Sequence, residues 1–360
     1  MPKQNSTLKT EYGSKKMKEI GLFGSWLTVN RRCNFRCKWC YGQETDYKPE
    51  DDMDLDLALK LINLEIGIGV QSVILIGGEP TLWPHIFTVN KYIKVKGMNS
   101  FLVTNGFLFS GERFMKKVAE FPFDNVTISL KAGNFRQYRK LTGVDAFEQV
   151  LSGIHNLREG GYNFDVSITL SSLVADNLSE IVKTAVDAGA KGVKIEFCAA
   201  TFKSNDARRG YMMSPSEVVK CIMHHYETMN LYTEGRLMIE QSLPFCLWPV
   251  DFLASLKEKN QIISSCHVLR REGIIFDPHG KVIQCNGLYE YPLGKFGVDF
   301  KDPLSFADFW MRPDVVNFYN RLIAYPSQQC IGCFQYDECG GGCPLQWFVF
   351  NPEEIIPKRR

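Results

Sequence analysis

Three cysteines, Cys33, Cys37 and Cys40, form a C-x3-C-x2-C pattern, and the aromatic residue Tyr41 follows directly. Three thiolates on so short a loop can converge on one site, but they cannot close a four-coordinate site. Structural zinc normally takes four protein ligands, and a thioredoxin-like redox pair needs only two cysteines. The triplet therefore favours a [4Fe-4S] cluster that keeps one iron for a non-protein ligand. Packing cysteines or a partial zinc site are the alternatives.

The elements that must position this loop alternate between short apolar, β-branched runs and amphipathic stretches. Strands are predicted at residues 25–30, 72–76, 100–104, 126–130, 164–169 and 192–197, with helices near residues 55–66, 86–95, 112–119, 147–159 and 178–188. Apolar strands separated by helices indicate parallel βαβ units, which suit an open partial barrel or a doubly wound sheet. The cysteine triplet lies in the loop after the first strand.

Polar residues collect where these strands end. They are Glu79, Thr104, Asn105, Ser129, Thr169 and Glu196. In parallel α/β folds the carboxyl ends of the strands meet at one edge, and ligands bind there.

A second motif, Gly77-Gly78-Glu79-Pro80, ends the second strand about 40 residues after the triplet. Together the two motifs resemble the radical S-adenosylmethionine (SAM) enzymes, in which the triplet holds a [4Fe-4S] cluster and the G-G-E-P segment binds the methionyl amino group of SAM. The resemblance implies a partial (β/α)6 TIM-like barrel. It also implies that Ser129 and Arg139 hold the carboxylate or ribose of SAM. Lys131 stands where many peptide-modifying relatives carry aspartate.

The remaining patterned cysteines lie near the carboxyl terminus. Cys266 and Cys285 flank a predicted hairpin with its turn at residues 277–280, and a C-x2-C-x5-C-x3-C run follows at Cys330, Cys333, Cys339 and Cys343. Such spacing is compatible with a zinc ribbon. Downstream of a radical SAM core, however, it resembles the SPASM extension, a small cysteine-rich domain with auxiliary [4Fe-4S] clusters. That resemblance implies one cluster on Cys266, Cys285 and Cys343, and a second on Cys330, Cys333 and Cys339.

This chain departs from the SPASM pattern in two ways. No cysteine follows Cys343 in the sequence, so the expected second cluster has three visible cysteines and is open, ligated by another group, degenerate or absent. Cys246 is a candidate to complete the first cluster. In sulfatase-maturing relatives an aspartate proton acceptor follows the second hairpin cysteine, and Asn286 stands there instead. A neutral amide cannot act as a general base. Weak substitutes are Glu196, Tyr289, Glu290 and Tyr291.

The composition excludes some other classes. The chain has 360 residues with 42 basic and 40 acidic side chains, and its net charge of +2 is too small to attract nucleic acid. No apolar run is long enough for a signal core or a membrane span, and twelve cysteines in such a chain favour metal ligands in the reducing cytoplasm. We expect an arm at 1–20, a radical SAM core at 21–235 and a SPASM-like domain at 236–360.

The resemblance implies reductive cleavage of SAM to a 5'-deoxyadenosyl radical that takes a hydrogen atom from the substrate. One SAM-binding and one or two auxiliary clusters are expected, with flavodoxin or ferredoxin as reductant. SPASM enzymes mostly oxidise or crosslink residues of ribosomally made peptides, so a peptide is the expected substrate. Many begin with a leader-binding domain, but here the barrel pattern starts near residue 22, so a separate peptide-recognition protein is a candidate partner. Oxidation of a small metabolite, such as an alcohol or a tetrapyrrole side chain, is the alternative, and an iron-sulfur electron carrier is the non-enzyme alternative.

Overall fold

The computed structural model describes residues 20–40, 48–203, 206–208, 210–240, 242–263, 266–268 and 270–358. The arm predicted for residues 1–20 lies outside these ranges apart from residue 20, and so does Tyr41. Within the described residues, one sheet contains eleven strands, and β7 (Thr201–Lys203) and β8 (Asp206–Arg208) form a separate two-stranded sheet.

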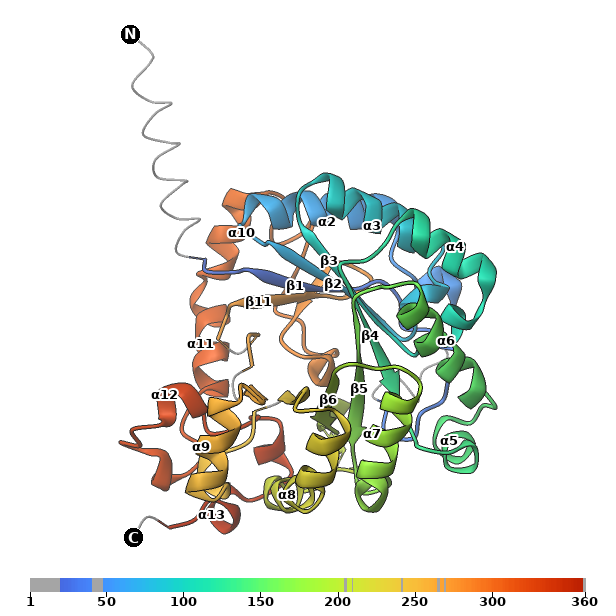
Figure 1. Cartoon of the computed structure of the whole chain (residues 1–360). Helices are drawn as coiled ribbons and strands as arrows, with labels where there is room; N and C mark the ends of the chain where they lie inside the picture. The colour runs from blue at the N-terminus through green and yellow to red at the C-terminus, as the bar shows by residue number, and fades with distance from the viewer. Residues whose placement is uncertain are drawn as a thin grey trace.

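The six predicted strands are present and lie side by side in chain order, with every neighbouring pair parallel. A doubly wound sheet reverses its strand order at a switch point. The consecutive order therefore confirms the open partial barrel (Figure 1). The strands are β1 (Gly24–Thr28), β2 (Ser72–Ile76), β3 (Asn99–Thr104), β4 (Asn125–Leu130), β5 (Phe164–Leu170) and β6 (Val193–Phe197).

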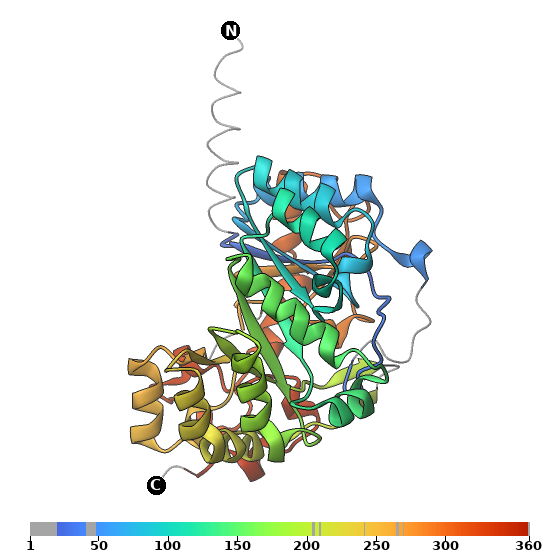
Figure 2. The same cartoon turned by 45° about the vertical axis from the view of Figure 1, so that its right-hand side comes forward.

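Helices connect these strands along the outer face of the curved sheet (Figures 1 and 2). The five predicted helices are α2 (Leu55–Gly67), α3 (Ile86–Val95), α4 (Glu112–Glu120), α6 (Phe147–Glu159) and α7 (Leu178–Asp187). A further helix, α5 (Phe135–Thr142), was not predicted because its residues are mostly polar. It begins where the Asn134 side chain accepts a hydrogen bond from the Gln137 N–H, and it ends at Gly143.

The sheet continues beyond the six strands at both edges. β9 (Leu237–Glu240) pairs with β6, and β10 (Ile262–Ile263) pairs with β9. At the other edge β11 (Gly273–Phe276) lies parallel to β1 and forms the expected hairpin with β12 (Lys281–Ile283), next to β13 (Gly294–Lys295). One sheet thus crosses the boundary predicted between residues 235 and 236, and that division stays a prediction.

The carboxyl-terminal half adds helices around the open side of the barrel. α8 (Pro215–Tyr232) begins at the predicted Ser214 cap with Pro215 in its first turn. The others are α9 (Val250–Glu258), α10 (Pro303–Trp310), α11 (Pro313–Leu322), α12 (Tyr336–Cys339) and α13 (Pro352–Ile355). Short 3-10 helices are η1 (Pro49–Asp51), η2 (Pro80–Leu82), η3 (Phe107–Ser110), η4 (Ala175–Asn177), η5 (Phe245–Leu247), η6 (Asn286–Leu288), η7 (Gln328–Cys330) and η8 (Gln346–Phe348). Of the helices described, none has the length and apolar character needed to cross a membrane.

The two faces of the sheet differ in chemistry because successive strand residues point to opposite sides. On one face, side chains such as Leu75, Ile128 and Ile168 are fully buried in the main apolar core. The opposite face of β4 to β6 carries Thr127, Ser129, Lys194 and Glu196 in the alternate positions. The partial barrel therefore encloses a polar inner face.

Glu65 is the one charged side chain on α2 that lies fully in the core, and it makes stability depend on pH. Burial raises the pKa of Glu65 to about 8, although the Ser25 hydroxyl partly opposes the rise. When folding raises the pKa of an acid, ionisation of that acid disfavours the folded state. The free energy of unfolding therefore falls as pH rises from 4.5 through 8. We expect Glu65→Gln to stabilise the chain at pH 8 by up to roughly 4 kcal/mol and to flatten this slope. Urea unfolding at pH 5 to 8 measures it.

The matched control is Asp56→Asn at the exposed start of the same helix, which should leave the slope unchanged. Equal pH slopes for the parent chain and Glu65→Gln would contradict this role of Glu65.

Candidate active site and metal centres

The glycine turn after β2 lies directly against the chain that leads into the cysteine triplet. The Gly78 N–H donates to the Asn30 carbonyl at 3.0 Å, and the Glu79 N–H donates to the Arg32 carbonyl at 2.9 Å. A Cβ atom on Gly78 would lie within 3.0 Å of the Arg31 and Arg32 carbonyl oxygens. The glycine is therefore needed for this close approach, and the turn sets where the cysteine loop begins.

Glu79 connects this turn to the end of β3. Its buried carboxylate accepts four hydrogen bonds, from the N–H and hydroxyl of Thr81, the hydroxyl of Thr104 and the N–H of Asn105, at 2.5 to 3.1 Å. Burial raises the pKa of Glu79, and these four donors oppose the rise. Pro80 opens η2, and Gly77 packs against Asn30. The side chain of Glu79 is thus committed to holding the turn in place.

Asn105 extends the same network to the cysteine loop. Its side-chain amide donates to Asn34 Oδ1 at 2.8 Å, while its own N–H is held by Glu79. The Phe35 N–H donates to Cys33 Sγ at 3.3 Å. The end of β3, the glycine turn and the cysteine loop therefore form one hydrogen-bonded unit.

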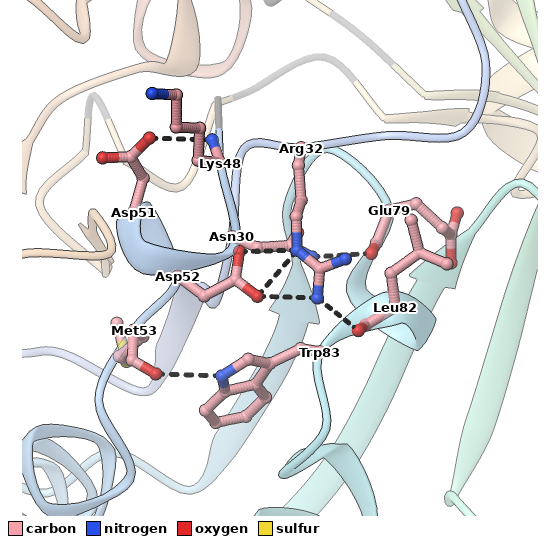
Figure 3. A network of polar contacts seen from close by, with 9 residues as sticks. All are labelled: Asn30, Arg32, Lys48, Asp51, Asp52, Met53, Glu79, Leu82 and Trp83. Atoms are coloured by element: carbon pink, nitrogen blue, oxygen red, sulfur yellow. Dashed lines mark hydrogen bonds and ion pairs between the residues drawn. The ribbon is translucent and has the colours of Figure 1, made fainter. Parts of the chain in front are cut away.

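Arg32, just before the triplet, links the segment that follows the cysteine loop to the same turn (Figure 3). Its Nε donates to Asp52 Oδ2 at 2.8 Å, and its Nη2 donates to the Leu82 carbonyl at 2.5 Å. The Trp83 indole N–H donates to the Met53 carbonyl at 2.9 Å. Both ends of the segment that contains the triplet are thus fixed to η2 and its flanks.

The three thiols of the triplet lie close enough to influence one another. Burial, the charge of Glu79 and then the thiols of Cys37 and Cys40 raise the pKa of Cys33 to about 12. Burial also raises the pKa of Cys37, which Lys131 lowers in part. Among the residues that the structure describes, no three His, Cys, Asp or Glu side chains form a group that could hold a metal ion. Three neighbouring thiols match the donor set of a four-iron cluster, whose thiolates sit on separate irons.

Tyr138, on the unpredicted helix α5, faces these cysteines. Its side chain is fully buried, and its hydroxyl has no hydrogen-bond partner within the described chain. Burial, followed by Cys37 and Cys33, raises the pKa of Tyr138 well above its ordinary value. A buried donor without a protein partner near Cys37 and Cys33 fits a cluster whose sulfurs accept hydrogen bonds. Sequence reasoning missed this residue because the helix is short and mostly polar, although the spacing of Phe135, Tyr138 and Leu141 is a helical signal that could have found it.

We expect Tyr138→Phe to lower the reduction potential of the cluster predicted at the triplet by some tens of millivolts. The reason is that hydrogen bonds to cluster sulfurs stabilise the reduced, more negative state. Redox titration followed by electron paramagnetic resonance measures the potential, and iron content should stay unchanged. Tyr162→Phe is the control, and equal potentials for both variants would contradict the expectation.

The structure separates the two residues predicted to hold the carboxylate or ribose of SAM. Ser129 lies on the inner face, where its hydroxyl is 3.1 Å from that of Ser167 on β5. Arg139 is exposed on α5 and pairs with Asp145, with 3.1 Å between Nε and Oδ1. Consecutive residues of an α-helix differ in direction by about 100°, and here Tyr138 is buried whereas Arg139 faces solvent. The structure does not bring Arg139 to the other site residues.

A row of charged side chains crosses the inner face at the carboxyl ends of the strands. Thr169 on β5 pairs with Glu196 on β6. Leu130 pairs with Ile168, so the next residue, Lys131, lies beside Thr169. Ile195 pairs with Ile239, so Glu240 on β9 lies beside Glu196. Burial and then the charge of Glu240 raise the pKa of Glu196 to about 7, while Lys131 and Lys194 lower it. Since Lys131 also acts on Cys37, this row extends toward the triplet.

The other proton-acceptor candidates lie elsewhere. Tyr289 packs under the guanidinium of Arg31, with 4.8 Å from Cζ to the ring centroid, and Glu290 is exposed. Asn286 begins η6 and Tyr291 is half-buried near its end. Of these candidates in the described chain, Glu196 is the half-buried acidic group in the row with Lys131, and burial raises its pKa to about 7.

The carboxyl-terminal cysteines form two groups. Burial, then Cys285 and Cys266, raise the pKa of Cys343 to about 12, so these three thiols lie near one another, and their role as ligands of one cluster stays a prediction. The Gly287 N–H donates to Cys285 Sγ at 3.4 Å, and the Cys343 N–H donates to the Ser242 carbonyl at 3.0 Å.

Cys246 differs from its predicted place. It was expected beside Cys266, Cys285 and Cys343, but it lines a cavity with Cys330, Cys333 and Cys339. Burial and the thiols of Cys339, Cys330 and Cys333 raise the pKa of Cys246 to about 12, although the residue as a whole reaches the surface. The difference arises because the segment before α9 packs against α12, a contact between distant parts of the chain.

Comparison with known proteins agrees with this arrangement. Residues 27–188 match the radical SAM superfamily. The chain is similar to an AdoMet-dependent heme synthase of Methanosarcina barkeri, at 29% identity over 54% of this chain and 55% of the relative. It is also similar to a probable GTP 3',8-cyclase of Saccharolobus islandicus, at 33% identity over 38% of this chain and 43% of the relative. The chain thus spans about half the length of these two relatives.

Similar solved structures cover almost the whole chain. One is anSMEcpe with bound AdoMet, with a TM-score of 0.68, 17% identity and coverage of 89% of both chains. Another is Streptococcus suis SuiB bound to the precursor peptide SuiA, with a TM-score of 0.68, 14% identity and coverage of 97% of this chain and 79% of SuiB. At these identities the likeness shows the fold, including the cysteine-rich region. The sequence match, the triplet and the partial barrel together identify residues 27–188 as a radical SAM domain.

Proposed function

We propose that this radical SAM enzyme oxidises or crosslinks a residue of a ribosomally made peptide. One observation carries the proposal. Trp39 of the triplet loop packs against the same buried apolar cluster, built on Cys198, Leu288 and Leu345, as the thiol residues Cys285 and Cys343. A substrate side chain held at this cluster would have the triplet on one side and the second cysteine group on the other.

The cofactors follow from these donor sets. Cys33, Cys37 and Cys40 hold a SAM-binding [4Fe-4S] cluster, and the turn Gly77 to Pro80 with Ser129 lines the place for SAM. When bound and reduced, this cluster supplies an electron that cleaves SAM to methionine and a 5'-deoxyadenosyl radical, which takes a hydrogen atom from the substrate. The carboxyl-terminal cysteine groups hold auxiliary clusters.

Oxidation of the substrate requires that it lose one further electron and one proton after the hydrogen atom. Glu196 is the residue best placed to accept the proton, because it is half-buried on the inner face near Lys131 and its pKa is about 7. Cys266, Cys285 and Cys343 would hold an iron-sulfur cluster, and such a cluster would accept that electron. A one-electron donor such as flavodoxin or ferredoxin supplies the electron for SAM cleavage.

A peptide substrate is supported by the structures solved with peptides, anSMEcpe with the Cp18Cys peptide and SuiB with SuiA. A separate peptide-recognition protein is a further candidate partner. The second candidate function is oxidation of a small metabolite, which the sequence similarity to a heme synthase and a GTP cyclase favours.

The test is anaerobic incubation with SAM, a reductant and a synthetic peptide encoded beside the gene. We expect 5'-deoxyadenosine and a peptide that is two hydrogens lighter, in equal amounts. Formation of 5'-deoxyadenosine without any change in the peptide, but with oxidation of an added tetrapyrrole, would favour the small metabolite. A protein that carries the first cluster and forms no 5'-deoxyadenosine would contradict the enzyme function.

A further inference from the structure

Four cysteines from two distant segments line one small cavity in the carboxyl-terminal region. Cys246 follows β9, whereas Cys330, Cys333 and Cys339 belong to η7, α12 and the loop between them. All four line a cavity of about 60 Å³. Cys330 and Cys339 are buried, each 8% exposed, so two of the four thiol residues lie away from solvent.

The chain around Cys246 is fixed in this position by contacts on both sides. The neighbouring Phe245 N–H donates to Cys339 Sγ at 3.3 Å. Pro244 packs against Gly342, which adopts a left-handed φ of 87°, and a Cβ there would lie 2.8 Å from Pro244 Cδ. Cys246 therefore faces the other three thiols as part of a packed interface.

A salt bridge closes the same interface from α9. Lys257 Nζ lies 2.7 Å from Oε2 of Glu338, and Glu338 directly precedes Cys339. The same Nζ lies 4.0 Å from the centroid of the Phe245 ring. The segment that carries Cys246 and the segment that carries Cys339 thus share a hydrogen bond to sulfur, an apolar contact and an ion pair.

We propose that Cys246 is the fourth protein ligand of the iron-sulfur cluster held by Cys330, Cys333 and Cys339. Four thiolates close a [4Fe-4S] cluster without an outside ligand. The group of Cys266, Cys285 and Cys343 is then left with three, so the two auxiliary sites differ in ligand number. This inference rests on the auxiliary clusters of the proposed function.

The test uses full-length chain in which Cys33, Cys37 and Cys40 are all replaced by Ala, so that only auxiliary iron is counted. Anaerobic iron, sulfide and zinc analysis with Mössbauer spectra should give about eight irons, two clusters of four. Adding Cys246→Ala should lower the iron below this value and replace one four-iron spectrum by a three-iron spectrum or none. Cys221→Ala on α8, away from both groups, is the matched control and should keep all the iron.

A second variant covers the case in which Cys246→Ala does not fold. Cys246→Ser keeps the size and offers an oxygen ligand, so the Mössbauer parameters of one iron should shift while the iron count holds. Unchanged iron and spectra in both variants would overturn the role of Cys246 alone. Zinc in place of iron before Cys246 is changed would overturn the auxiliary clusters of the proposed function together with this inference.

Discussion

Replacing Gly78 with Ala is expected to remove the iron of the SAM-binding site. The added Cβ would meet the Arg31 and Arg32 carbonyl oxygens within 3.0 Å, and both obstacles are backbone atoms rather than flexible side chains. The chain that leads into Cys33 must therefore move, and its hydrogen bonds to the glycine turn must break. We expect a loss of about four irons, no 5'-deoxyadenosine, and a loss of stability of about 1 to 3 kcal/mol.

The matched control is Gly24→Ala in β1, at a glycine where a Cβ would meet nothing within 4 Å and the φ angle is ordinary. This variant should keep full iron and SAM cleavage. Iron analysis, 5'-deoxyadenosine by chromatography and thermal unfolding compare the two. If Gly78→Ala behaved like Gly24→Ala, the turn would not be what positions the cysteine loop.

The barrel and the edge that carries the site were predictable because both depend on local patterns. Apolar strands separated by amphipathic helices predict parallel pairing, and parallel strands bring their carboxyl ends to one edge. Glu79 and Glu196 could be placed there from strand ends alone. The sequence does not reveal, however, that the Glu79 carboxylate accepts hydrogen bonds from Thr81, Thr104 and Asn105.

Other site residues depend on contacts between segments far apart in sequence. Glu240 lies near Glu196 because β9 pairs with β6, and neither the spacing nor the composition of the sequence predicts that pairing. Cys246 was assigned to the nearer hairpin cysteines, yet the structure joins its segment to Cys339, 94 residues from Phe245. Tyr138 lies on a helix with little apolar character. Such long-range contacts are fixed by packing, which a single sequence does not display.

Replacing Glu196 with Gln is expected to abolish most substrate oxidation while SAM cleavage continues. The amide cannot accept the proton that the substrate must lose, and general-base catalysis is typically worth about 10²- to 10⁴-fold in rate. In the parent chain the pKa of Glu196 is about 7, raised first by burial and then by Glu240. Because the ionised form is the base, the rate of peptide oxidation should rise between pH 6 and 8, and Glu196→Gln should lose that dependence.

The control is Glu290→Gln, which changes the other acidic candidate at an exposed position and should leave the rate and the pH profile as in the parent. The measurement is the ratio of peptide two hydrogens lighter to 5'-deoxyadenosine across that pH range. If Glu196→Gln still cleaves SAM, the triplet and the glycine turn are intact. A loss of oxidised peptide in that variant is then due to loss of the proton acceptor. A ratio and pH profile equal to those of the parent would exclude Glu196 and move the base to another group at the inner face.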